Sequence, residues 1–274
     1  MNEPFFDTHV HLGRSDTGEL YYGLLERREY ERLMDAAGVE QAFAFAPMRT
    51  DGYRTANAEL LADCEAGDGR IRAFARLGGD RLPVAEPQLW IARRALRARL
   101  GSLAGRGRAP DVEPGTLARY AGVKLLPHLD GVPDDDVFEA INAAGLPVLT
   151  HAGRYATPRF IERHILPRLT GTLIVAHLGA FPDRERDLKD AVELARREPR
   201  VVLDTSGIWI RDFLAYAVEQ VPERIVFGSD CPLTTPAVAW RMVESVVTDP
   251  GLRRRIGHDL AADLFGIAAP TPTP

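Results

Sequence analysis

Two histidines and an aspartate stand at alternate positions near the start of the chain, in the segment FFDTHVHLG. Side chains two residues apart in a β-strand share a face, so the imidazoles of His9 and His11 point the same way, about 6 to 7 Å apart. Two imidazoles on an interior face need polar partners, and one shared cation satisfies both. We expect Asp7 one layer deeper, where its carboxylate orients a histidine by hydrogen bonding. The segment therefore predicts part of a metal site.

Further polar side chains follow other apolar runs, at the points where those runs end. If the runs are parallel barrel strands, their carboxyl ends share one rim, where active sites are built. We expect the His151 imidazole and the Asp230 carboxylate to reach the first two histidines across that rim. Three nitrogens and one oxygen suit a divalent ion such as Zn²⁺, with one position open to water. His164 and His258 fall in helical segments, where we expect surface positions. The polar residues at the run ends are Lys124, His128, His151, His177, Asp204, Ser206, Ser229 and Asp230.

The elements that would position these residues are eight short apolar runs, separated mainly by segments with helical periodicity. The apolar residues in each run are continuous rather than alternating, which is typical of parallel strands buried on both faces. Eight strand–helix units in a chain of 274 residues predict an α/β fold, a single-domain (β/α)8 TIM barrel. A doubly wound open sheet has the same rhythm, but its Gly-rich phosphate turn is missing after the first run. The runs span residues 4–12, 39–47, 71–77, 121–127, 146–153, 172–179, 201–207 and 225–232.

Two segments depart from this rhythm. Residues 76–115 contain a predicted helix around 86–100 and then a Gly/Arg/Pro-rich loop, which is either a lid or a solvated excursion. Residues 268–274 are rich in Pro and Thr, so we expect a disordered tail. The predicted catalytic domain therefore covers residues 1–267.

The composition narrows the class of partner. A net charge of −5 and a pI near 5.8, with no basic stripe, argue against nucleic acid. No apolar stretch is long enough to span a membrane, and no secretory signal pattern is visible. Cys64 and Cys231 are too few for a disulfide framework, so a reducing cytoplasm is expected. The expected partner is a small-molecule substrate, with self-association into a homo-oligomer left open.

Five segments in this order and spacing resemble the amidohydrolase-related family of metal-dependent TIM-barrel hydrolases and decarboxylases: FFDTHVHLG, GVKLLP, PVLTHAG, IVAHLGA and IVFGSDCP. The resemblance covers nearly the whole chain. It implies metal ligands at His9, His11, His151 and Asp230, and a histidine at position 177 that polarises the substrate or relays a proton. One departure is Leu260, which stands where the last helix of the family commonly carries Asn; it concerns packing under the barrel.

Substrate contacts are expected from four basic residues. Arg14 and Arg154 directly follow two of the motifs and would clamp a substrate carboxylate, with an exposed ion pair as the alternative for each. Lys124 is costly to bury unless paired or modified. In some relatives of the superfamily that this chain resembles, a lysine on the fourth strand is a carbamate bridging two metals. We favour instead a paired lysine that binds a substrate carboxylate or carbonyl beside His128. Weaker candidates for substrate contact are Asp204 and Trp209.

Three functions are compatible with these residues. The favoured one is hydrolysis of an ester, lactone or amide of a small carboxylate-bearing molecule by a metal-activated water. Asp230 would take the proton from that water, and His177 would donate a hydrogen bond to the developing oxyanion. Nonoxidative decarboxylation of an aromatic or enoic acid is the second. A non-catalytic barrel that binds a partner is the third.

Overall fold

The computed structural model describes residues 4–16, 24–49, 52–79, 110–113 and 115–267. Eight parallel strands form one sheet in chain order, and they curl into a nearly closed barrel. The predicted (β/α)8 architecture is thereby confirmed. The helix expected around 86–100 and the tail 268–274 lie outside the described residues. The barrel strands are β1 (Phe5–His11), β4 (Val39–Phe45), β5 (Ile71–Leu77), β6 (Gly122–Leu125), β7 (Val148–Thr150), β8 (Leu173–Val175), β9 (Val201–Asp204) and β10 (Ile225–Val226).

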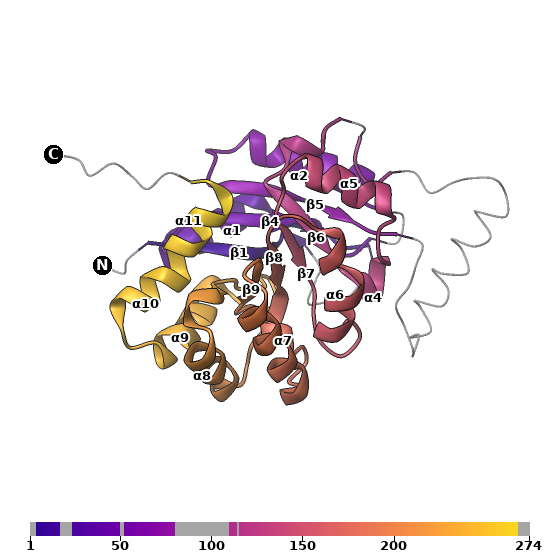
Figure 1. Ribbon diagram of the computed structural model, residues 1–274. Helices are drawn as coiled ribbons and strands as arrows, with labels where there is room; N and C mark the ends of the chain where they lie inside the picture. The colour runs from indigo at the N-terminus through magenta and orange to yellow at the C-terminus, as the bar shows by residue number, and fades with distance from the viewer. Residues whose placement is uncertain (1–3, 17–23, 50–51, 80–109, 114, 268–274) are drawn as a thin grey trace.

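Helices surround the barrel (Figure 1). A small antiparallel hairpin of β2 (Gly13–Arg14) and β3 (Leu24–Leu25) follows the first strand. The α-helices are α1 (Arg27–Ala37), α2 (Arg54–Glu65), α4 (Pro127–Asp130), α5 (Asp135–Ala143), α6 (Pro158–His164), α7 (Glu185–Arg197), α8 (Arg211–Gln220), α9 (Pro236–Val246), α10 (Pro250–Arg254) and α11 (Leu260–Phe265). Short helical turns are η2 (Leu117–Arg119), η3 (Leu166–Arg168), η4 (Ala176–Gly179), η5 (Pro222–Arg224) and η6 (Arg255–Asp259).

Local sequence signals set several helix ends. Helices α6, α9 and α10 begin at a proline preceded by Thr157, Thr235 or Asp249, whose side-chain oxygen accepts a backbone N–H three residues further on. This arrangement satisfies an orphan donor of the first turn, and proline fits the first helical position. Helix α1 ends at Gly38, whose φ of 84° is the left-handed conformation that glycine adopts without penalty.

The apolar residues divide into two clusters, one between the strands and the outer helices and one inside the barrel. Helix α11 closes the interior cluster at the amino-terminal end of the strands. Its Phe265 stacks on Phe43 with ring centroids 3.8 Å apart, and Leu260 is buried against the same cluster. The interior is therefore packed at this end, and the polar residues lie at the other. Other members of the interior cluster are Phe6, Phe45, Phe74, Leu149, Ile174, Val202 and Val226.

Strand β1 does not follow a simple alternation. Its register against β4 shifts between Asp7 and Val10. Phe6 packs in the barrel interior, and His9 also faces the interior, where its ring lies 5.1 Å from that of Phe45. A bulge changes which residues share a face and is common beside active sites.

The expectation that the Asp7 carboxylate orients a histidine was therefore wrong. Its Oδ2 accepts a hydrogen bond from the hydroxyl of Tyr30 in α1, outside the barrel, at 2.7 Å. Its Oδ1 accepts the backbone N–H groups of His9 (3.2 Å) and Ser229 (2.8 Å). The carboxylate holds the backbone of β1 rather than orienting an imidazole, because the irregularity in β1 turns it away from the interior.

Two other expectations concern the surface. His164 is exposed on α6, as predicted, but His258 is buried beside the Phe6 ring and pairs with Asp259 at 2.9 Å, so its surface assignment was wrong. The end of α11 reaches the barrel floor, which draws the neighbouring η6 turn inward.

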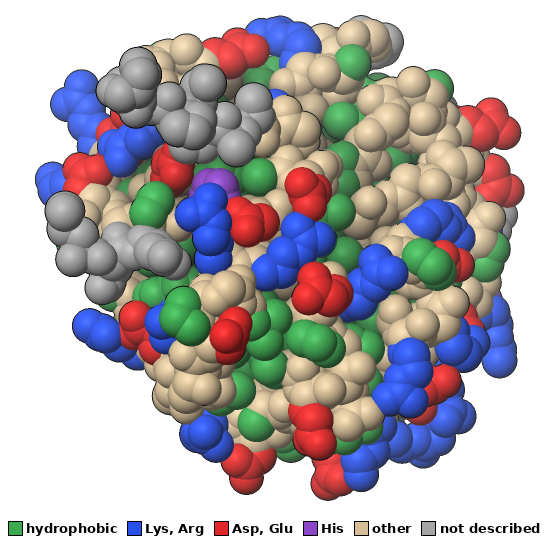
Figure 2. Space-filling model, turned by 60° about the vertical axis from the view of Figure 1, so that its left-hand side comes forward, with side chains coloured by type: hydrophobic (Ala, Val, Ile, Leu, Met, Phe, Trp, Pro, Cys, Tyr) green, Lys and Arg blue, Asp and Glu red, His purple; other side chains and the backbone are tan. Residues whose placement is uncertain are grey.

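The face drawn in Figure 2 carries acidic and basic side chains interspersed. Among the described helices, none combines the length and apolarity needed to traverse a bilayer.

Candidate metal centre

Three of the predicted metal ligands meet at the carboxyl end of the barrel. His9 and His11 come from β1, and Asp230 follows β10. One ligand atom from each lies within 4.8 Å of the other two, and all three residues are buried. Asp230 Oδ1 lies 3.1 Å from His11 Nε2 and 3.4 Å from His9 Nε2. The first and last barrel strands are neighbours across the seam, which is why residues from the two ends of the chain converge here.

The backbone around Asp230 is built for this position. Asp230 has a φ of 63°, a left-handed conformation that aspartate tolerates better than most residues. Its N–H donates to the carbonyl of His9 at 2.9 Å. A Cβ on Gly207 would lie 3.1 Å from Asp230 Oδ2 and 3.0 Å from His177 Nδ1, so glycine at 207 allows these side chains to pack closely.

Asp204, at the end of β9, orients the His9 ring. Its Oδ2 lies 2.7 Å from His9 Nδ1. A carboxylate with a pKa lowered to about 2 only accepts hydrogen bonds at neutral pH, so we assign the His9 proton to Nδ1. Burial alone would raise the Asp204 pKa, but the imidazoles of His9 and His177 and the hydroxyl of Ser206 outweigh it. The unprotonated Nε2 of His9 then faces Asp230, as metal coordination requires.

His177 and His151 form a second pair of imidazoles. His177 adopts a φ of 59°, and its Nδ1 lies 2.9 Å from the carbonyl oxygen of Ser206. The carbonyl only accepts, so we assign the His177 proton to Nδ1 and leave Nε2 as an acceptor. His151 Nδ1 lies 3.0 Å from that Nε2 and is its donor. His151 is thus placed beside His177 rather than within the three-residue cluster, with its own Nε2 as the atom open to ligation.

Lys124 projects into the same space from β6. Its Nζ lies 3.2 Å from His9 Nε2 and 4.5 Å from the centroid of the Phe45 ring. Burial lowers the pKa of Lys124 to about 7, although Asp204 and Asp230 pull it upward. An amine with this pKa is partly neutral at physiological pH. The structure therefore places Lys124 beside the predicted ligands, in contact with one of them.

The imidazoles of His11, His151 and His177 are neutral at physiological pH. Burial lowers the pKa of His11 to about 3 and that of His177 to about 4, and it lowers the pKa of His151 as well. The carboxyl of Asp230 is ionised: burial would raise its pKa, but the nearby His9, His11 and His177 hold it below its ordinary range. Neutral imidazoles and an ionised carboxylate are the protonation states that a divalent ion needs.

These residues fit a divalent ion. Asp230 Oδ1 is a buried carboxylate oxygen that, among the described residues, receives no hydrogen bond of good geometry. Such an oxygen, flanked by two histidine nitrogens, lacks a partner of positive charge. A cation would supply it, with donor atoms of the types that zinc and other borderline ions take.

Aromatic rings wall the space next to His151. The ring of His128 lies 4.4 Å from that of His151 and 5.9 Å from that of Tyr155, the latter nearly parallel. Phe181 closes another side, 5.5 Å from His151 and 5.0 Å from His177. A flat ring fits such a wall better than a branched chain does.

His128 is held there by a buried ion pair that sequence reasoning missed. Helix α4 carries both His128 and Asp130, and Asp130 Oδ2 accepts from Arg76 Nε at 2.8 Å. Tyr53 donates its hydroxyl to the other oxygen at 2.8 Å and lies under the guanidinium. Arg76 is fully buried on β5. A charged residue inside an apolar run was its only signal in the sequence.

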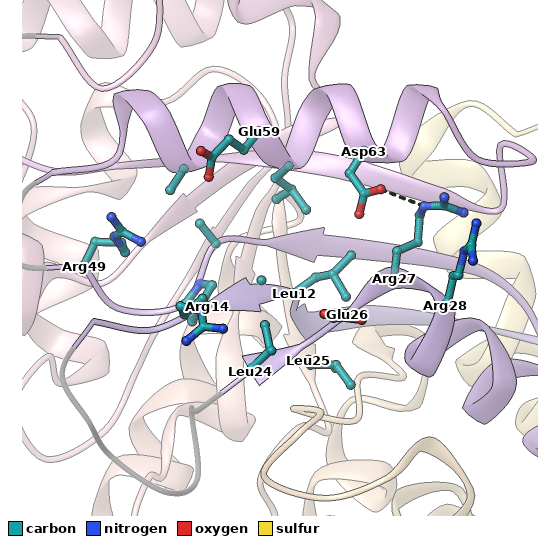
Figure 3. Close-up of a pocket in the computed structure, with 15 residues that line it drawn as sticks. Leu12, Arg14, Leu24, Leu25, Glu26, Arg27, Arg28, Arg49, Glu59 and Asp63 are labelled. Carbon is teal, nitrogen blue, oxygen red and sulfur yellow. Dashed lines mark hydrogen bonds and ion pairs between the residues drawn. The ribbon is translucent and has the colours of Figure 1, made fainter.

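The substrate-binding residues predicted at the rim are more exposed than the predicted metal ligands. Arg14 is exposed and lines a groove of about 500 Å³ between α2 and the β2–β3 hairpin, together with Arg49 and Glu59 (Figure 3). Arg154 is exposed, with its guanidinium 5.4 Å from the Tyr155 ring. Trp209, after β9, is 47% exposed. The structure does not bring these side chains into the cluster of ligand atoms, and their substrate roles stay predictions.

The family model described as amidohydrolase matches residues 6–267. No curated protein sequence matches the chain significantly. Among solved structures, a proposed 2-pyrone-4,6-dicarboxylic acid hydrolase from Pseudomonas putida is similar, with 19% identity, a TM-score of 0.67 and coverage of 97% of this chain and 98% of the other. The 5-carboxyvanillate decarboxylase of Sphingomonas paucimobilis has 18% identity, a TM-score of 0.60 and coverage of 97% and 99%.

A third similar structure is a dihydroxybenzoic acid decarboxylase from a Polaromonas species, with bound manganese and an inhibitor. It shares 15% identity, with a TM-score of 0.60 and coverage of 96% of this chain and 97% of the other. At such identities the likeness to these structures shows the fold alone.

Proposed function

The chain belongs to the amidohydrolase family, and on that premise we propose that it is a metal-dependent hydrolase of an ester, lactone or amide bond in a small carboxylate-bearing molecule. The observation that carries this proposal is the convergence of His9, His11 and Asp230, whose ligand atoms lie within 4.8 Å of one another in a buried site. Burying an unpaired carboxylate is costly, so this cluster does not stabilise the fold by itself and is explained better as a ligand site.

The same three residues would hold the ion, with His151 as the proposed fourth ligand. We propose zinc, given the nitrogen and oxygen donors, and manganese is the alternative because a similar structure contains it. When bound, a divalent ion acts as a Lewis acid and lowers the pKa of water towards neutrality.

Two residues would handle the protons. Asp230 is ionised at neutral pH, so its carboxylate can accept a proton beside the reacting bond and return it to the leaving group. His177 would donate to the oxyanion that develops on the substrate. In the present arrangement its Nε2 is occupied by His151 Nδ1, so donation requires a second proton on the His177 ring or the movement of His151.

The substrate would be a planar carboxylate. The rings of His128, Tyr155 and Phe181 support a flat molecule, and Lys124 supplies a positive charge or a hydrogen-bond donor for its carboxylate or carbonyl. The similar proteins are named for carboxylated rings, a pyrone dicarboxylate and carboxyvanillate, which fit the same description.

Decarboxylation of an aromatic acid is the second candidate, supported by the decarboxylases among the similar structures. The two reactions differ in their products, since decarboxylation releases CO₂ and hydrolysis releases a new carboxylate and an alcohol or amine.

The test uses the purified full chain. Its metal content is measured by elemental analysis, and a panel of small lactones, esters and carboxylated aromatic rings is assayed for hydrolysis and CO₂ release, before and after chelation. We expect about one ion per chain and hydrolysis that is lost on chelation and restored by zinc or manganese. The exposed His164→Ala variant should match the wild type. CO₂ release without hydrolysis would replace the proposal with its alternative, and full activity of the metal-free protein would contradict both.

A further inference from the structure

We propose that Asp204 is a positioning residue that fixes the proton of the His9 imidazole and the backbone of His177, two neighbouring residues whose ring centroids lie 5.1 Å apart. The inference deepens the proposed function, because it concerns how the protein prepares His9 for a cation. It rests on hydrogen-bond geometry at the end of β9, in the segment VVLDTSG.

Both oxygens of the Asp204 carboxylate accept hydrogen bonds. Its Oδ2 faces His9 Nδ1 at 2.7 Å. Its Oδ1 accepts the backbone N–H of His177 at 2.8 Å, the backbone N–H of Ser206 at 3.0 Å and the Ser206 hydroxyl. Both oxygens are fully buried, so water cannot replace these contacts. A group that must accept on both sides has to be a carboxylate.

Contacts at the other ring nitrogen agree with this assignment. Lys124 Nζ lies 3.2 Å from His9 Nε2 and can donate to it. A proton on Nδ1 therefore satisfies both sides of the ring, whereas a proton on Nε2 would leave Nδ1 facing an acceptor in Asp204. The Ser206 Oγ also lies 2.9 Å from Nδ1, but its hydroxyl proton is donated to Asp204 Oδ1. The Nε2 lone pair is thereby aimed at the space beside Asp230, 3.4 Å away.

The second function of Asp204 concerns His177. Residues 177 and 178 both have positive φ, 59° and 49°, a conformation that is unfavourable for residues other than glycine. The hydrogen bond from the His177 N–H to Asp204 holds this turn. One buried carboxylate thus links the end of β8 to the imidazole supplied by β1.

The test compares Asp204→Asn with Asp7→Asn. In Asp204→Asn the new side-chain amide can present its oxygen to only one side. Because Oδ1 of the natural residue serves two backbone N–H groups, we expect the amide NH₂ to face His9 Nδ1 and move the His9 proton to Nε2. At position 7 we expect the same substitution to be tolerated, because the amide oxygen can keep both backbone donors and the NH₂ can donate to the Tyr30 hydroxyl oxygen.

The primary readout is the tautomer of His9 in the metal-free protein, from ¹⁵N imidazole spectra assigned with a His9→Gln variant. We expect Nδ1–H in the wild type and in Asp7→Asn, and Nε2–H in Asp204→Asn. The second readout is a zinc titration, in which Asp204→Asn should bind roughly 10- to 100-fold more weakly. Near-UV circular dichroism reports whether each variant is folded.

An Nε2–H tautomer of His9 in the wild type overturns the proposal without any variant, including the case in which Asp204→Asn does not fold. Weaker zinc binding by Asp204→Asn with an unchanged tautomer also overturns it, because the residue would then act only through stability. If the wild type binds neither zinc nor manganese, the proposed function fails, and the tautomer comparison still decides the role of Asp204.

Discussion

Asp230 contacts His9 twice. Its backbone N–H donates to the His9 carbonyl at 2.9 Å, and its Oδ1 lies 3.4 Å from His9 Nε2. The first contact joins the last barrel strand to the first, and the second forms one edge of the candidate metal centre. The residues that join the last strand to the first therefore also build the site, and a side-chain substitution at either one tests the site while leaving the backbone contact in place.

His9→Ala and Asp230→Asn should each abolish activity. His9→Ala removes a nitrogen ligand, so we expect elemental analysis to find no ion in that variant. Asp230→Asn replaces the only carboxylate of the cluster with a neutral amide, which weakens ion binding and removes the proton acceptor. His164→Ala, on the exposed face of α6, is the matched control and should keep its ion and its turnover. A fully active His9→Ala protein would contradict the assignment.

His177→Asn should keep the ion and lose turnover. His177 is not among the three clustered ligands, but it lies beside them, with its Nδ1 3.9 Å from Asp230 Oδ2. Loss of one oxyanion donor slows an enzyme roughly 100- to 1,000-fold. The measurement is kcat and KM together with metal content per chain. Unchanged kcat would refute the role of His177, and loss of the ion would reassign it as a ligand.

The buried histidines make the metal-free protein sensitive to acid. Burial lowers the pKa of His128 to about 3, whereas the unfolded residue titrates near 6.5. Between these values the unfolded chain holds a proton that the folded one does not, so the free energy of unfolding falls as the pH drops from 6.5 towards 3. The slope is about 1.4 kcal/mol per pH unit for each such group.

His128→Gln should reduce the change of the free energy of unfolding with pH by the contribution of one proton. Urea unfolding of the metal-free protein between pH 7 and 4.5 measures the slope for the wild type, for His128→Gln and for the exposed control His164→Gln. Equal slopes in all three proteins would show that His128 is not held neutral by burial.

Removing one partner of the Arg76–Asp130 pair should lower the free energy of unfolding strongly. Arg76→Met leaves the Asp130 carboxylate buried without its guanidinium, which costs about 3 to 5 kcal/mol. Arg76→Met combined with Asp130→Leu removes both charges and should recover most of that loss. Urea unfolding at pH 7 is the measurement. The exposed pair of Arg159 and Asp190 is the control, and Arg159→Met should leave stability nearly unchanged. A small effect of Arg76→Met would mean that water reaches Asp130.

The sequence alone determined the barrel and the set of residues at its mouth. Eight continuous apolar runs predict parallel strands buried on both faces, and the polar residues that end six of these runs are then expected at the shared rim. The positions of His9, His11, His177 and Asp230 followed from that reasoning, because the point at which each apolar run ends can be read from the local sequence.

Tertiary structure decided which polar groups touch. Asp7 and Asp204 are both buried aspartates on strands, yet only Asp204 meets an imidazole, because the register shift in β1 turns Asp7 outward. The pairing of His151 with His177 and the burial of Arg76 likewise depend on neighbours from other strands. Alternation along a strand specifies a face only while the register is regular, and hydrogen-bond partners across the barrel are fixed by distances that no single segment contains.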